Sequence, residues 1–122
     1  MILVDTSIWI DHLSRSSSRL EALLDAGAVL IHPFVIGEIA LGRLGPREAT
    51  LARLARLPQT AVATPDEVLN TIERNGLFGI GIGYVDAHLL AAALLMGRVP
   101  LWTTDKRLRQ SAGKMGLIYA PD

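Results

Sequence analysis

This chain of 122 residues has no cysteine, few aromatic residues and no net charge. The absence of cysteine excludes disulfides and thiolate metal sites, and it fits a reducing compartment. No apolar run reaches the roughly 18 residues that a membrane span needs, and the first residues lack the basic region of a signal peptide. We therefore expect a soluble cytoplasmic protein without a membrane partner.

The charged residues balance, with 12 basic and 12 acidic side chains, so the composition gives no sign of nucleic-acid binding. Their distribution is uneven. The segment 98–122 carries five basic residues against Asp105 and Asp122, an excess of three positive charges that leaves residues 1–97 with three net negative charges. Both a basic surface beside an acidic site and an ordinary solvated helix face are consistent with this distribution.

Apolar residues make up 50% of the chain but aromatic residues only 5%, so the core must be built from Leu, Ile, Val and Ala. The length suits one domain over residues 1–122 with a genuine core. The mean hydropathy of +0.35 is high for so small a domain. We therefore expect an apolar patch that a partner covers, and a homodimer.

Short apolar runs alternate with amphipathic segments along the whole chain. The expected strands cover residues 2–4, 28–31, 60–63, 100–103 and 117–120, with helices between them. The clearest helix start is Thr64-Pro65-Asp66-Glu67, which has capping-box spacing, and Ser18 with Glu21 has the same spacing. Because each connection is too long for a hairpin, the pattern predicts an α/β fold: a central parallel sheet, with the first strand in the middle, flanked by helices on both faces.

Two of these strands end in hydroxyl residues and an acid. Ile2-Leu3-Val4 is followed by Asp5, Thr6 and Ser7, and Leu101-Trp102-Thr103-Thr104 is followed by Asp105. Ligands of open α/β sheets bind outside the carboxyl ends of the strands. Each acid therefore has two possible roles, as part of a site at this edge or as the N-cap of the next helix.

Two further acids lie in apolar surroundings. Asp86 is the only acid of the helix expected from Tyr84 to Met96, which is apolar nearly all round and should be buried. A buried carboxylate needs hydrogen bonds, a paired charge or a metal ion. Glu38 has apolar neighbours on every side near the start of the helix after the second strand, although a solvated helix face would also explain it.

A doubly wound fold would bring these four acids to one edge of the sheet. Like charges so close repel one another and raise each other's pKa unless a cation is present. Oxygen ligands without cysteine, and with no histidine grouped among them, favour Mg²⁺ or Mn²⁺ over Zn²⁺. The sequence therefore predicts a metal site of four carboxylates.

The acids and their neighbours resemble the four motifs of PIN-domain ribonucleases, and specifically of the VapC-type toxins of bacterial toxin–antitoxin pairs. The resemblance covers essentially the whole chain. It rests on Val-Asp-Thr-Ser around Asp5, Ile-Gly-Glu-Ile around Glu38, Tyr-Val-Asp-Ala around Asp86 and Thr-Thr-Asp-Lys around Asp105. Ser7 and Thr103 match the small polar positions that the family has beside its metal.

This resemblance implies a single PIN-like nuclease domain that is a Mg²⁺-dependent endoribonuclease, with Mn²⁺ as a substitute, inhibited by a cognate antitoxin. The four acids would be the catalytic and metal-binding residues, Asp105 binding the ion directly or through water. The cations nearest to the acids in sequence, which we expect to hold the RNA substrate, are Lys106, Arg107 and Arg109.

Two other functions remain as alternatives. A phosphoacceptor receiver domain would need a phosphorylated acid after the third strand, where Asp66 lies, and a domain could also keep the fold only as a non-catalytic interaction module. A phosphatase with Asp-x-Asp after the first strand is excluded, because Ser7 occupies the second position.

The remaining motifs favour structural roles. Gly79 to Gly83 lacks the Lys-Ser/Thr ending of a phosphate loop and is interpreted as a flexible connection. His12, His32 and His88 show no ligand spacing, so we expect surface or capping roles for them.

Overall fold

The computed structural model of the protein describes residues 1–121, in which three short parallel strands form the sheet. The central strand β1 (Ile2–Val4) lies between β2 (Val29–Leu30) and β3 (Leu101–Trp102). Leu3 is in register with Leu30 on one side and with Leu101 on the other. The predicted parallel α/β fold with a central first strand is therefore confirmed.

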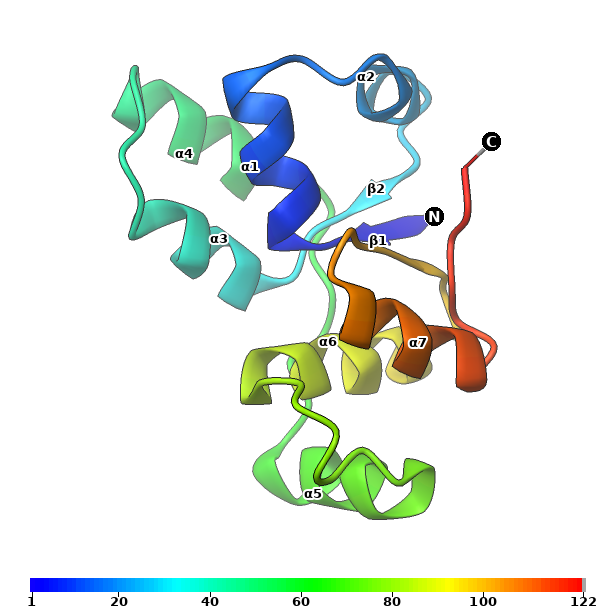
Figure 1. Ribbon diagram of the computed structural model, residues 1–122. Helices are drawn as coiled ribbons and strands as arrows, with labels where there is room; N and C mark the ends of the chain where they lie inside the picture. The colour runs from blue at the N-terminus through cyan, green and yellow to red at the C-terminus, as the bar shows by residue number, and fades with distance from the viewer. Residues whose placement is uncertain (122) are drawn as a thin grey trace.

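Helices cover both faces of this sheet. Figure 1 shows α1 and α2 on one side, α6 and α7 on the other, and α5 packed against α6 at the greatest distance from the strands. The helices are α1 (Thr6–Ser14), α2 (Ser18–Asp25), α3 (Pro33–Ala40), α4 (Arg47–Ala55), α5 (Pro65–Asn75), α6 (Tyr84–Leu95) and α7 (Lys106–Lys114). The chain leaves β1 toward β2 and later returns past β1 to β3.

The core consists of aliphatic side chains from the sheet and from α6. Leu3, Leu101, Leu89 and Leu90 have no exposed surface. As expected, α6 is buried over most of its length, from Ala87 to Ala93. In residues 1–121, no helix has the length and apolar character needed to cross a bilayer.

Two predicted strands shrink to single bridges. Residues 60–63 form no strand, and only Gln59 pairs with Ile31. The next residue along β2, His32, already begins α3, so the pairing edge ends there. Near the C-terminus only Ile118 pairs with Leu101, through the hydrogen bonds from Leu101 N–H to the Leu117 carbonyl and from Tyr119 N–H to the Leu101 carbonyl.

The helix ends largely follow the sequence signals. Thr64 and Glu67 form the predicted capping box of α5, and Gly76 closes that helix in the left-handed conformation at φ 60°. The predicted cap of α2 is wrong by one residue, since the hydroxyl of Ser17 accepts from the N–H of Leu20 at 3.2 Å.

Candidate active site

Asp5 follows β1, and only 6% of its surface is exposed. Its Oδ2 accepts hydrogen bonds from the hydroxyls of Thr103 at 2.6 Å and Ser7 at 3.0 Å. Although Asp5 stands at the N-cap position of α1, its side chain makes no capping hydrogen bond. The carboxylate is therefore held by two hydroxyl groups rather than by the helix backbone, which offsets part of the cost of burying it.

The same two hydroxyls connect the ends of β1 and β3. The Ser7 Oγ accepts from the N–H of Thr104 at 3.1 Å, and the Thr103 Oγ1 accepts from the N–H of Asp105 at 3.0 Å. A hydroxyl that accepts from a backbone N–H keeps its own proton for donation to Asp5. Ser7 and Thr103, the two small polar residues singled out in the sequence, thus orient the Asp5 carboxylate.

Glu38 projects from α3, and its side chain is exposed. The hydroxyl of Thr6 donates to its Oε1 at 2.6 Å, so the residue after Asp5 contacts an acid 32 positions away. Sequence reasoning missed Thr6. Its position between Asp5 and Ser7 in the first motif was the available signal. In this run Asp5 is one of the acids, and the hydroxyls of Thr6 and Ser7 each donate to an acid.

Asp86 is half-buried in the first turn of α6, and its Oδ2 accepts from the N–H of Gly83 at 3.0 Å. Burial raises the pKa of this carboxyl, the Gly83 hydrogen bond opposes that rise, and repulsion from Asp5, Asp105 and Glu38 adds to it. The other three predicted acids therefore all lie within electrostatic reach of Asp86.

Asp105 is exposed at the end of β3 and caps α7, since its Oδ1 accepts from the N–H of Leu108 at 2.9 Å. The capping role considered from the sequence is therefore present. Capping occupies one carboxylate oxygen and does not remove the charge, which still acts on Asp86. Asp66, the acid that a receiver domain would need, is exposed at the start of α5, away from the sheet (Figure 1).

The carboxylates fit a hard divalent ion by their chemistry, because all are oxygen donors and their mutual repulsion falls when a cation binds. Among residues 1–121, no three His, Cys, Asp or Glu side chains are close enough together to hold an ion directly. Mg²⁺ usually keeps several water ligands and uses only one or two carboxylates. The arrangement therefore suits an ion bound partly through water.

Two histidines next to the acids are buried. The Nδ1 of His32 accepts from the N–H of Phe34 at 2.9 Å and caps α3, which confirms the predicted capping role. Burial, together with the nearby His88, lowers the pKa of His32 to about 4. His88 itself is 4% exposed, not on the surface, and packs edge to face against Phe34 and Tyr84 with ring centroids 4.7 Å away.

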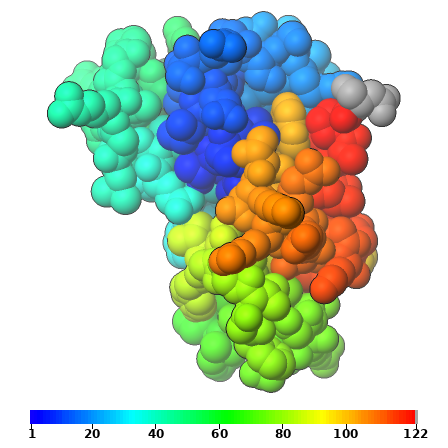
Figure 2. Space-filling model, viewed as in Figure 1, coloured from blue at the N-terminus to red at the C-terminus, as the bar shows by residue number. Residues whose placement is uncertain are grey.

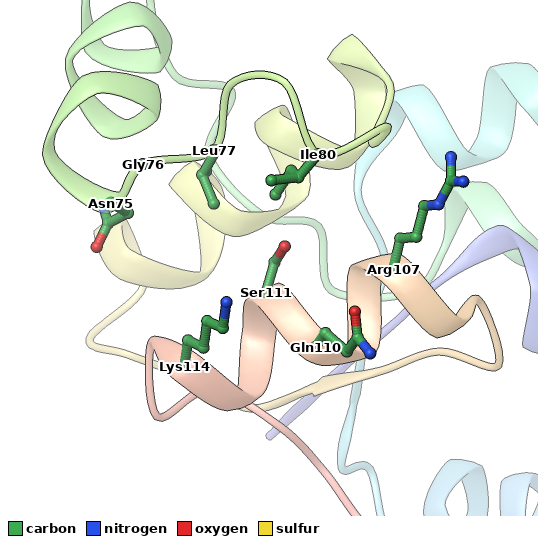
Figure 3. A pocket seen from close by; sticks show the side chains of 8 residues that line it. All are labelled: Asn75, Gly76, Leu77, Ile80, Arg107, Gln110, Ser111 and Lys114. Atoms are coloured by element: carbon green, nitrogen blue, oxygen red, sulfur yellow. The ribbon is translucent and has the colours of Figure 1, made fainter.

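The three basic residues predicted to bind RNA, Lys106, Arg107 and Arg109, project from different sides of α7. Arg107 lines a cavity between α7 and the segment that precedes α6, whereas Lys106 and Arg109 do not line it. Lys114, the last residue of α7 and not predicted from the sequence, lines the same cavity (Figure 3). At about 100° per residue, Arg109 projects from the opposite flank of the helix to Arg107.

Comparison with known proteins identifies related chains. The model of the PIN domain family matches residues 2–114. Ribonuclease VapC32 of Mycobacterium tuberculosis, in two strains, is 46% identical over 122 residues, which is all of this chain and 98% of the relative.

Two solved structures share the fold. PAE2754 from Pyrobaculum aerophilum superposes with a TM-score of 0.64 at 20% identity, over 90% of this chain and 83% of its own. FitAcB from Neisseria gonorrhoeae gives a TM-score of 0.62 at 19% identity, over 93% of this chain and 94% of its own. At such low identity these likenesses concern the fold alone.

Proposed function

The chain belongs to the PIN-domain family, among its VapC-type ribonucleases, and we propose that it is a divalent-metal-dependent endoribonuclease and the toxin of a toxin–antitoxin pair. In this proposal residues 1–122 act as one nuclease domain in the cytoplasm. The proposed catalytic and metal-binding residues are Asp5, Glu38, Asp86 and Asp105.

The hydroxyls that orient two of the acids are the observation that carries the proposal. Ser7 and Thr103 donate to Asp5, and Thr6 donates to Glu38. Burial raises the pKa of Asp86, and repulsion from the other three acids adds to this rise. Repulsion of this kind costs stability in a purely structural protein, but it is offset when a divalent ion binds. The 46% identity to a ribonuclease over the full chain supports the same conclusion.

The side chains around the acids would fix the geometry of the bound ion. Asp5, held by Ser7 and Thr103, supplies a carboxylate in a fixed orientation. The hydroxyl of Thr6, the next residue, binds the carboxylate of Glu38. Bound Mg²⁺ or Mn²⁺ supplies an activated water and neutralises charge that develops on the scissile phosphate. Asp5, Glu38 and Asp86 would hold the ion, in part through water molecules, and Asp105 would hold it directly or through water.

Cleavage of RNA with and without Mg²⁺ or Mn²⁺ tests this function. Wild-type protein should cut single-stranded RNA only when one of the ions is present. Asp86→Asn, which keeps the size of the side chain, should lose at least about 100-fold in rate. Asp66→Asn is the matched control, an exposed first-turn acid of α5, and should leave the rate unchanged.

Equal loss in both variants would refute the site assignment. Labelling by a small phosphodonor that disappears in Asp66→Asn would instead support the receiver alternative. A protein that binds the ion without cutting RNA would be the non-catalytic interaction module.

We further propose that a cognate antitoxin inhibits by inserting an Arg or Lys side chain among the acids, where it competes with the ion for the same charges. Antitoxin affinity should then fall as Mn²⁺ rises, and Glu38→Gln should weaken it. If affinity ignores both, inhibition acts by covering the RNA-binding surface. The expected homodimer is tested separately by light scattering of the free protein.

A further inference from the structure

A small polar cavity lies beside the acidic site, between α7 and the segment that leads from α5 to α6. Its volume is about 100 Å³. The residues that line it are Asn75, Gly76, Leu77, Ile80, Arg107, Gln110, Ser111 and Lys114. In Figure 3 the Lys114 ammonium and the Ser111 hydroxyl both extend toward the interior, beneath Leu77 and Ile80.

The lining has the chemistry of an anion site. Two cations, two amides and one hydroxyl line the cavity, and in the part of the chain that the structure describes no carboxylate joins them. Ser111 is 3% exposed, so its hydroxyl belongs to a built wall rather than to a mobile surface. Lys114 and Arg107 would attract a phosphate, and the hydroxyl and amides would supply directed hydrogen bonds to its oxygens.

Arg107 lies at the end of the cavity nearest to the acids. Its guanidinium rests on the backbone of Gly81, where an added Cβ would collide with Nη1 and stand 2.9 Å from Cζ. Gly81 is two residues before Gly83, whose N–H donates to Asp86. Figure 2 shows side chains around α7, in orange, over the yellow-green segment that leads into α6. The glycine-rich connection thus leaves room for Arg107 close to the acidic site.

Helix geometry puts the lining residues of α7 on one flank. At about 100° per residue, Arg107, Gln110 and Lys114 fall within one narrow arc. Asp105, at the start of the helix, belongs to the acidic cluster. Lys114 is nine residues farther on, or about 13 Å along the axis, which corresponds to a few nucleotide steps.

We propose that this cavity is a phosphate subsite for single-stranded RNA. Lys114, with Ser111, binds a backbone phosphate a few nucleotides from the scissile bond, and Arg107 binds a phosphate between that position and the acids. Gly81 is a positioning residue, because its missing side chain determines where the guanidinium lies. This inference rests on the proposed ribonuclease function and deepens it by assigning the path of the substrate.

The first test measures the binding of a fluorescent single-stranded RNA of mixed sequence with divalent ions chelated, across a salt series. Lys114→Gln should weaken binding roughly 3- to 10-fold and reduce the slope of log affinity against log salt by about 0.7, the value for one lost phosphate contact. Arg19→Gln removes the same charge from exposed α2 on the other face of the sheet and should change neither.

The second test uses two glycines with the same backbone requirement. Gly81 and Gly79 have φ of +84° and +70°, but a Cβ at Gly79 would meet nothing within 4 Å. Gly81→Ala and Gly79→Ala therefore carry similar strain, and only the first displaces Arg107. Gly81→Ala should weaken RNA binding more than Gly79→Ala, and it should have no further effect in an Arg107→Gln background.

Equal RNA affinity of wild type and Lys114→Gln, or equal effects of the two glycine variants, would overturn the proposal. Inorganic phosphate can be added to test whether it competes with the RNA. If Lys114→Gln changed this competition but left the affinity for RNA unchanged, the cavity would bind free phosphate and the RNA subsite would be refuted. Cleavage with Mn²⁺, measured in parallel, separates the two proposals. A wild type that binds RNA through Lys114 without cutting it would contradict the ribonuclease function alone.

Discussion

The ends of β1 and β3 have the same sequence design and different structures. Each strand is a short apolar run that leads to an acid with hydroxyl residues beside it, after Asp5 and before Asp105. Asp5, after β1, is buried and bound by two hydroxyls, and its side chain does not cap α1. Asp105, after β3, is exposed and caps α7.

Tertiary contacts account for this difference. β1 is central, so the hydroxyls of Ser7 and Thr103 reach Asp5 from both its own helix and the neighbouring strand. Asp105 follows β3, one of the two outer strands, and its carboxylate binds the start of its own helix. A local pattern thus predicts an acid at a strand end, and the position of the strand in the sheet decides the role of that acid.

The largest expected effect distinguishes the two acids in catalysis. Asp5→Asn should reduce RNA cleavage at least about 100-fold, because it removes a fixed ligand charge from the interior of the site. Asp105→Asn should reduce it less, since that acid is exposed and binds the ion directly or through water. Single-turnover rates with Mn²⁺, with melting curves to verify folding, measure both. A larger loss in Asp105→Asn would reverse the comparison.

After β2 the residue that caps the next helix is His32, a side chain that can take up a proton. Burial, with the nearby His88, lowers the pKa of His32 to about 4 from the ordinary value of 6.5. The unfolded chain therefore takes up a proton at His32 before the folded protein does. Stability should be fully present above about pH 6.5 and fall as the pH drops toward 4, by up to about 3 kcal/mol.

His32→Asn should keep the cap and remove most of this pH dependence. Urea unfolding of both proteins at about pH 7 and about pH 4 measures the difference. The raised pKa of Asp86 acts in the opposite direction, favouring the folded state as pH falls, but both proteins share it. An unchanged pH dependence in His32→Asn would show that His32 does not titrate as described.

A smaller effect concerns the hydroxyl that holds Asp5. Thr103→Val keeps the shape of the side chain but leaves the buried Asp5 carboxylate without its shorter hydrogen bond, so it should cost about 1–3 kcal/mol. Thr104→Val is the matched control, because the side chain of Thr104 is exposed. Urea unfolding at neutral pH should separate the two variants. Equal stabilities would mean that the hydroxyl contributes little.

The smallest effect belongs to the cap of α7. Asp105→Ala should lower the free energy of unfolding by about 1 kcal/mol, and Asp105→Asn should restore most of it, because Asn is an equally good cap. The same pair at Asp5 should behave otherwise, since no capping bond exists there. Urea unfolding of the Ala and Asn variants at both positions, beside wild type, measures the four changes in stability. If Asn restored the stability lost in the Ala variant at position 5 but not at position 105, the assignment of the caps would be contradicted.

The sequence predicted the elements with strong local signals. The capping box at Thr64 follows from four neighbouring residues. The parallel fold follows from the alternation of elements and the length of their connections, and the central first strand from the usual order of a doubly wound sheet. The strand expected at residues 60–63 failed because its existence depends on how far β2 extends, and His32 ends β2 early. Pairing partners of this kind are long-range information.

The same limit applies to the candidate site. The acids were found because carboxylates among apolar residues and at strand ends are conspicuous. Ser7 and Thr103 were found because they match the small polar positions of the PIN-domain motifs. The contact of Thr6 with Glu38, the rest of Arg107 on Gly81 and the burial of His88 depend on segments that meet only in the folded chain. Neither the spacing nor the composition of the residues predicts these contacts between distant segments.

The most direct test of a shared acidic ion site is to measure Mn²⁺ binding by calorimetry and by the change in melting temperature. The proteins compared are wild type, the control Asp66→Asn, and the three site variants Asp5→Asn, Glu38→Gln and Asp86→Asn. Wild type and Asp66→Asn should bind alike, with a stabilisation of about 2.7 kcal/mol at 100 times the dissociation constant. Each of the other three variants should bind more weakly. A wild type that does not bind the ion, or three variants that bind it as wild type does, would contradict the shared site.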